Sequence, residues 1–240
     1  TSIAGMSVAF PVGCGLALVL GVINNLRVEM AQGALKSNLV LLAIGVALVV
    51  VAVVLNGIAS GKKAGNAQIS KADQRKGIIL AVVAGVVMSF FSSFVMKAMD
   101  LNDFANMAPG RVGPYTAIVV FSLAVLVSHF VFGPIFMKWP FQGAPVKMSE
   151  YFKGNAKTHL VGMLGGCIWC LGTALSYIAA GKAGASVSYA LGQGAPMVAA
   201  IWGVFVWKEF KGSNKVVYGL LGAMFCFFIV GLGMIVAAGM

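Results

Sequence analysis

The chain alternates long apolar segments with short polar connections. Seven apolar segments are each long enough to cross a hydrocarbon core of about 30 Å as a helix. The period-two alternation that marks barrel strands is absent, so we predict an all-α fold, a polytopic transmembrane helix bundle. The seven predicted spans are Ser2–Asn24, Asn38–Ile58, Gly77–Ala98, Gly113–Lys138, His159–Ala180, Gly184–Trp207 and Lys215–Gly239.

Two short segments of the chain resemble each other. Ala4–Gly15 reads AGMSVAFPVGCG and Ala183–Gly194 reads AGASVSYALGQG, with six of twelve positions identical. The copies begin five predicted spans apart, and an odd number of spans reverses the direction in which the chain crosses the membrane. Inverted repeats of this kind occur in many secondary transporters.

The repeat spacing also predicts how the chain is organised. If each repeat has five helices, residues 77–240 form a complete second repeat and residues 1–58 hold the last two helices of the first. Residues 59–76 then form the connecting loop on the cytoplasmic side. We therefore expect three further helices before Thr1.

Composition supports membrane insertion. Hydrophobic residues make up 60% of the chain and charged residues only 10%, against about 25% charged in a soluble domain. The formal net charge of +11 is spread over the connections, so no basic patch for nucleic acid is predicted.

The basic residues are unevenly divided between the two sides of the membrane. Alternate connections carry 12 Lys and Arg on one side and 5 on the other. By the positive-inside rule the richer side is cytoplasmic, which places the C-terminus outside.

Polar residues within the sixth span are the main candidates for a solute site. Ser186, Tyr189 and Gln193 share one helical face, and their hydroxyl, phenol and amide groups suit a neutral polyhydroxylated or amide-rich solute. The alternative is a hydrogen-bonded seam between helices. Gly192, Gly194 and Pro196 are expected to break the same helix, and broken helices at mid-membrane are where transporters bind solutes.

Other candidates lie on three further spans. In the first span, Ser7 and Phe10 occupy the repeat positions that match the sixth-span residues, and Phe10 and Cys14 pair with Tyr189 and Gln193. In the fifth span, Trp169 could stack on a sugar ring or simply pack between helices.

His129 lies about 14 Å from the cytoplasmic end of the fourth span, at nine residues of 1.5 Å each, and is a proton-coupling candidate. A neutral, hydrogen-bonded histidine is the alternative.

No catalytic or metal site is predicted. All six Asp and Glu residues fall in connections or at span ends, so we expect no buried carboxylate, and a carboxylate coupling site would have to lie at a span end or before Thr1. The four cysteines lie within spans and are expected to be buried thiols. Cys167 and Cys170 have metal-motif spacing, but two His are too few to complete a site. We expect no cofactor.

The sixth span and its following loop carry a family resemblance. Ser186–Gly212, SVSYALGQGAPMVAAIWGVFVWKEFKG, resembles the ninth helix of bacterial glucose-uptake, rhamnose-proton symport and ureide permease-like proteins of the drug/metabolite transporter superfamily. The segment AGMSVAFPVGCGLALVLGVI, residues 4–23, resembles their fourth helix. The resemblance implies ten helices as a five-plus-five inverted repeat, of which this chain lacks the first three, and a bacterial inner membrane.

Together these features predict a secondary-active permease, not an enzyme, because the spans hold no cluster of acid, base or metal-binding groups. The solute would be small, neutral and polar, such as a sugar or related metabolite, moved by alternating access or symport. The alternative is a non-transporting membrane subunit or scaffold of a larger complex. The expected partners are the solute and the lipid bilayer. A homodimer or a larger membrane complex stays open as an alternative.

Overall fold

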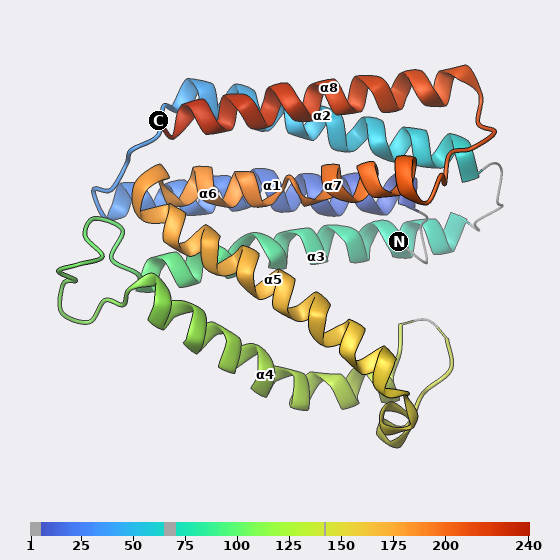
Figure 1. Ribbon diagram of the computed structural model, residues 1–240, viewed down its shortest axis with the longest axis horizontal. Coiled ribbons are helices and arrows are strands. Elements are labelled where there is room, and N and C mark those ends of the chain that lie inside the picture. Colours follow the sequence, from blue (N-terminus) through green and yellow to red (C-terminus); the bar gives the residue numbers. More distant parts are fainter. Residues whose placement is uncertain (1–5, 65–70, 142) are drawn as a thin grey trace.

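The computed structural model describes residues 6–64, 71–141 and 143–240, and for residues 6–11, 64 and 71–74 it describes the backbone alone. Within these ranges seven helical stretches are long and apolar enough to cross a membrane, which confirms the predicted bundle. The elements shown in Figure 1 are α1 (Met6–Ala31), α2 (Leu39–Ala64), α3 (Lys71–Ala98), α4 (Pro114–Lys138), η1 (Met148–Lys153), α5 (Ala156–Ala183), α6 (Ala185–Gly192), α7 (Ala195–Ile201), η2 (Trp202–Val206) and α8 (Lys215–Ala238).

Three helices extend well beyond the predicted spans. Helix α1 continues from Asn24 to Ala31, α2 continues from Ile58 to Ala64, and α3 begins at Lys71 instead of Gly77. Hydrophobicity locates the membrane-embedded part of a helix, whereas backbone hydrogen bonds can continue into the interface, where charged side chains reach water. The sequence therefore predicted the number of these helices correctly but placed their ends too early or too late.

The sixth span is broken where the sequence predicted it. Helix α6 ends at Gly192 and α7 begins at Ala195, with Pro196 in the first turn of α7. The short turn between them is closed by hydrogen bonds from the Gln193 N–H to the Ala190 carbonyl and from the Gly194 N–H to the Leu191 carbonyl, 3.1 and 2.9 Å long. Because proline has no N–H, the regular helical ladder cannot run through this point.

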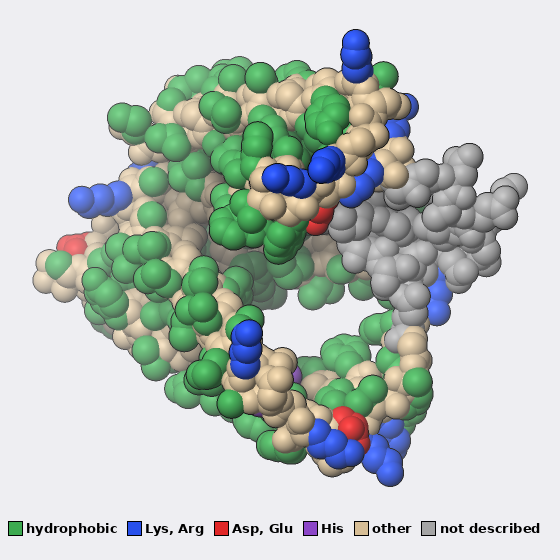
Figure 2. All heavy atoms as spheres, turned by 45° about the vertical axis from the view of Figure 1, so that its right-hand side comes forward, with side chains coloured by type: hydrophobic (Ala, Val, Ile, Leu, Met, Phe, Trp, Pro, Cys, Tyr) green, Lys and Arg blue, Asp and Glu red, His purple; other side chains and the backbone are tan. Residues whose placement is uncertain are grey.

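Most of the helices form one packed group, and α4 and α5 extend away from it. In Figure 1, α2 lies along α8, α1 lies along α6, and α3 flanks α1. Helices α4 and α5 pack on each other and diverge from the group, and on α4 only Pro114 and Ala117 are buried. Figure 2 shows a hollow between the part of the molecule that carries the two histidines and the remainder.

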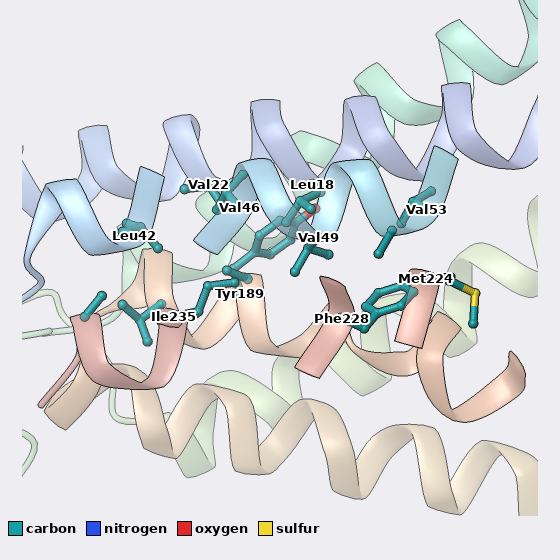
Figure 3. Close-up of a cluster of buried hydrophobic side chains, with 14 of the residues drawn as sticks. Leu18, Val22, Leu42, Val46, Val49, Val53, Tyr189, Met224, Phe228 and Ile235 are labelled. Atoms are coloured by element: carbon teal, nitrogen blue, oxygen red, sulfur yellow. The ribbon is translucent and has the colours of Figure 1, made fainter. Parts of the chain in front are cut away.

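Close helix contacts hold the packed group together. A Cβ atom on Gly231 of α8 would lie 2.9 Å from the Gly45 carbonyl oxygen of α2, so the two backbones touch at this crossing. Around it Val49, Tyr189 and Phe228 form part of a buried cluster from α1, α2, α6 and α8 (Figure 3). Small residues allow two helices to approach this closely in a membrane, where the hydrophobic effect does not drive helices together.

Candidate functional site

A buried carboxylate joins α1 to the start of α6. Glu29 is fully buried, and its Oε1 accepts a hydrogen bond of 2.8 Å from the Ser186 N–H. The Ser186 hydroxyl lies 3.1 Å from Oε1 and 3.0 Å from Oε2, and donates to the carboxylate. Since Glu29 is near the end of α1 and Ser186 near the beginning of α6, the two helices run antiparallel here. A negative charge at a helix N-terminus is favourable.

The expectation of no buried carboxylate is therefore wrong. Helix α1 does not stop at Asn24, and the partner of Glu29 lies 157 residues further along the chain. The site also requires a glycine: Gly184 has φ of +91°, and a Cβ there would lie 2.6 Å from Oε1 of Glu29. The amino group of Lys36 donates to the carbonyls of Leu101 and Gly181.

Tyr189 makes a second tie between α6 and α1. Its hydroxyl donates to the Ala17 carbonyl at 2.9 Å, and its side chain is 5% exposed. The ring lies directly against Gly21, where a Cβ would come within 2.2 Å of a ring carbon. Figure 3 shows the ring reaching from α6 into the buried cluster beside Leu18. In this conformation the phenol is engaged with α1.

The structure connects Tyr189 to Trp169 through two phenylalanines. We call Phe91, Phe121, Trp169, Tyr177 and Tyr189 the aromatic cluster; it joins α3, α4, α5 and α6. Ring centroids are 6.5 Å apart for Phe91 and Tyr189, 6.0 Å for Phe91 and Phe121, and 5.9 Å for Phe121 and Trp169. Trp169 is 53% exposed, and the buried Tyr177 hydroxyl has no hydrogen-bond partner in the described structure.

Gln193 lies in the turn between α6 and α7, one helical turn beyond Tyr189. It is eight residues from the start of α6, about 12 Å along a span of 22 residues, so it lies near mid-membrane. Its side chain is half-buried, and no described residue forms a hydrogen bond with the amide. The neighbouring Ser188, by contrast, donates to the Ser176 carbonyl on α5 at 2.6 Å.

A pocket lies C-terminal to this break, along the stretch from Pro196 in the first turn of α7 to Phe210. Its volume is about 280 Å³, and it lies between α2 and the segment from α7 to Phe210. Pro196, Asn56, Ser60 and Trp207 are among its lining residues. Gln193 is not among the lining residues, so this partly polar cavity between α2 and α7 lies beside the break and is distinct from it.

The remaining predicted site residues are not gathered here. The side chains of Ser7 and Phe10 lie outside the described residues. His129 is exposed on α4, with the Phe130 ring 6.3 Å away and no hydrogen-bond partner among the described residues.

Cys14 is half-buried and packs against the buried cluster around Tyr189. The expectation of buried thiols is wrong for Cys167 and Cys226, which are exposed on the outer faces of α5 and α8.

Sequence reasoning missed a polar seam between α1 and α3. The Asn24 amide donates to the Ser89 carbonyl and hydroxyl at 3.3 Å, and the Ser92 hydroxyl donates to the Asn25 side-chain oxygen at 3.3 Å. The signal was present as two adjacent asparagines followed by Arg27 and Glu29, with apolar residues at the positions between and after them. Treating Asn24 as the end of the span hid it.

Comparison with known proteins agrees with a permease. Residues 66–238 match the sequence profile of the family described as ureide permease. The chain is 26% identical over 163 residues to Ureide permease 1 of Arabidopsis thaliana, which covers 68% of this chain and 42% of that protein. It is 23% identical over 163 residues to Ureide permease 2 of the same plant, covering 68% of this chain and 41% of the relative.

The chain thus spans about two-fifths of the length of these curated relatives. No solved structure matches it significantly. Since these relatives are plant proteins, they give no support to the expectation of a bacterial inner membrane.

Proposed function

Because the chain belongs to the ureide permease family, we propose that it is part of a permease that moves a small, neutral, amide-rich solute of the ureide type by alternating access. The observation that carries the proposal is the Gln193 amide, half-buried at a helix break near mid-membrane and unbonded among the described residues. Unpaired amides are costly in hydrocarbon, so a polar solute is a suitable partner.

The chemistry of Gln193 matches a ureide. A urea group presents a carbonyl acceptor flanked by N–H donors, and a primary amide offers one acceptor and two donors in the same plane. The two groups can therefore form a pair of hydrogen bonds. A sugar, the other solute class predicted from the sequence, can also pair with the amide through two neighbouring hydroxyls, so the uptake experiment has to compare both solutes.

The tie between α1 and α6 supplies an element that can switch. Glu29 with Ser186 and Ala17 with Tyr189 join the two helices from the end of α1 inward. Alternating access in inverted-repeat transporters proceeds by rocking one half against the other around a fixed site. In our proposal these hydrogen bonds keep the solute pathway closed on the side of the membrane where α1 ends. They break when the pathway opens to that side.

Two further assignments rest on sequence. Proton coupling through His129 rests on the ability of an imidazole side chain to carry a proton and on the position of the residue within α4. Cytoplasmic placement of the basic connections rests on the 12-to-5 distribution of Lys and Arg.

The proposal is tested with Gln193→Ala in the full-length protein. Uptake of a labelled ureide and of a labelled monosaccharide is measured in vesicles, together with thermal stability in detergent. Loss of an amide hydrogen bond worth about 0.5–1.5 kcal/mol should weaken apparent ureide affinity several-fold with little change in melting temperature.

Ser188→Ala is the matched control, because its hydroxyl is already bonded to Ser176. It should lower stability and leave ureide affinity unchanged. If Gln193→Ala lowers stability but leaves affinity intact, Gln193 ties helices together and the proposed site is wrong. Uptake of the monosaccharide alone would replace the ureide with a sugar as the solute.

A further inference from the structure

A second pocket lies on another face of α3 from the one that carries Phe91 of the aromatic cluster. Its volume is about 310 Å³, and it is lined by the last part of α1, by α3 and by the connection after α3. Phe91 of the aromatic cluster contacts α4 and α6 residues, whereas Phe90 and Phe94 line this pocket. The pocket is therefore separate from the proposed solute site and does not depend on that proposal.

Three cations line this pocket: Arg27 of α1, Lys97 of α3 and Arg111 of the connection. No carboxylate is among the lining residues, and none of the described carboxylates lies within ion-pair distance of these three side chains. The Asp100 carboxylate is close enough to Arg111 for an electrostatic interaction, but it forms no ion pair with it, does not line the pocket, and accepts hydrogen bonds from backbone N–H groups such as that of Ala108. Like charges in one pocket repel, and an anion would offset that repulsion.

The cations are also unusual in their position. Only five Lys and Arg residues lie on the side of the membrane that is poor in positive charge, and three of them line this pocket. Within the described structure, Arg27 and the Lys97 amino group have no hydrogen-bond partner, while Arg111 donates to the Lys97 carbonyl. Two of the three cationic groups are thus free to bind a ligand.

The pocket has an apolar side and extends inward from the end of α1, through the depth of the headgroup layer and to the edge of the hydrocarbon core. The Phe90 and Phe94 rings stack with centroids 6.1 Å apart and are 43% and 68% exposed. Asn24, its deepest α1 residue, is seven residues before the end of α1, which corresponds to about 10 Å along the helix. Polar headgroup layers add about 5–7 Å on each side of the hydrocarbon core.

We propose that this pocket binds an anionic oxygen group, a phosphate or carboxylate, between Arg27, Lys97 and Arg111. The guanidinium groups offer paired N–H donors that match such oxygens. Asn24 and Ser93 provide further polar lining, and Phe90 and Phe94 contact an apolar part of the ligand. The group can come from an anionic lipid or from a small soluble anion.

The test uses the purified full-length protein in a non-ionic detergent. Thermal stabilisation is titrated with an anionic phosphatidylglycerol, with zwitterionic phosphatidylcholine, and with inorganic phosphate against chloride at equal ionic strength. The variant carries Arg27→Gln and Lys97→Gln, neither of which removes a side-chain hydrogen bond seen among the described residues. The control is Lys182→Gln, an exposed cation of the same cation-poor side that lies outside the pocket.

We expect the double variant to bind the anionic ligand about tenfold more weakly for each lost cation, with the control unchanged. Stabilisation by phosphatidylglycerol alone identifies a lipid headgroup, and stabilisation by phosphate as well identifies a free anion. Native mass spectrometry of bound lipid gives a second readout that does not depend on stability. Equal responses of the wild type and the double variant to both ligands would overturn the proposal.

Discussion

The Glu29 carboxylate of α1 receives hydrogen bonds from both the backbone N–H and the hydroxyl of Ser186 on α6, at 2.8–3.1 Å. Both residues are fully buried. One acidic side chain thus satisfies the first free N–H groups of α6 and fixes the end of α1 against it. This contact joins segments that are 157 residues apart in the sequence.

Replacing Glu29 should destabilise the fold strongly. Glu29→Ala leaves the buried Ser186 N–H and hydroxyl without their acceptor. Hydrogen bonds to a charged group are worth about 1.5–3 kcal/mol, so we expect the free energy of unfolding to fall by about this amount. Thermal unfolding in detergent measures the effect. Glu150→Ala is the control, because Glu150 forms an exposed ion pair with Lys153 and should cost under about 1 kcal/mol. Equal losses would show that Glu29 does not hold α6.

Tyr189→Phe should retain the packing and lose one hydrogen bond. The ring stays against Gly21, while the Ala17 carbonyl loses a donor, so we expect a loss of about 0.5–1.5 kcal/mol. Tyr115→Phe is the matched control on an exposed position. An unchanged melting temperature for Tyr189→Phe would mean that this bond does not stabilise the closed contact between α1 and α6.

The crossing of α2 and α8 should not tolerate a side chain on Gly231. Gly231→Leu would push against the Gly45 carbonyl and Val49, each 2.9 Å from the position of a Cβ, and separate the helices. We expect a loss of at least about 1–3 kcal/mol, or failure to fold. Gly233→Leu on the same helix meets open space and should express and melt like the wild type. If both variants behave alike, the close approach is not a determinant of the fold.

Acid should loosen the connection between α3 and α4. The N–H of Ala108 donates to Asp100 at 2.8 Å and holds the pKa of this carboxyl below its ordinary value of about 3.9. A group with a lowered pKa stabilises the folded loop above its ordinary pKa, and this stabilisation disappears as the pH falls through the lower folded value.

Hydrogen exchange of the Ala108 amide, followed as the pH falls below about 4, should therefore show loss of protection beyond the intrinsic pH dependence. In Asp100→Asn the loop should be less protected at neutral pH, and its protection should change less with acid. A steep acid response that persists in this variant would assign the effect to another group, such as Asp103, whose pKa is also lowered, chiefly by the Ala105 N–H.

The connections rich in Lys and Arg and those poor in them should be accessible from opposite sides of the membrane. Ala105→Cys lies between α3 and α4, and Ala144→Cys lies between α4 and α5; both positions are exposed. A membrane-impermeant maleimide applied to intact cells should label Ala105→Cys and reach Ala144→Cys only after permeabilisation. The unmodified chain, with its four native cysteines, is the background control. Labelling of Ala144→Cys alone in intact cells would reverse the proposed orientation.

Much of the fold could be predicted from local pattern. Apolar length alone determined the seven membrane-spanning stretches, because each must satisfy its own backbone hydrogen bonds in lipid. Local chemistry also located the break in the sixth span, since Pro196 removes a donor wherever it lies. These properties depend on residues close together in the chain.

Only the tertiary structure decided which polar groups are already engaged. Ser186, Tyr189 and Gln193 share one predicted face, yet the first bonds Glu29, the second bonds the Ala17 carbonyl, and the third has no partner among the described residues. The partners come from α1, more than 150 residues away, and no periodicity within one helix encodes which neighbour it meets. Hydrophobicity specifies that a helix enters the membrane, whereas side-chain shape and hydrogen bonding between distant segments specify its neighbours.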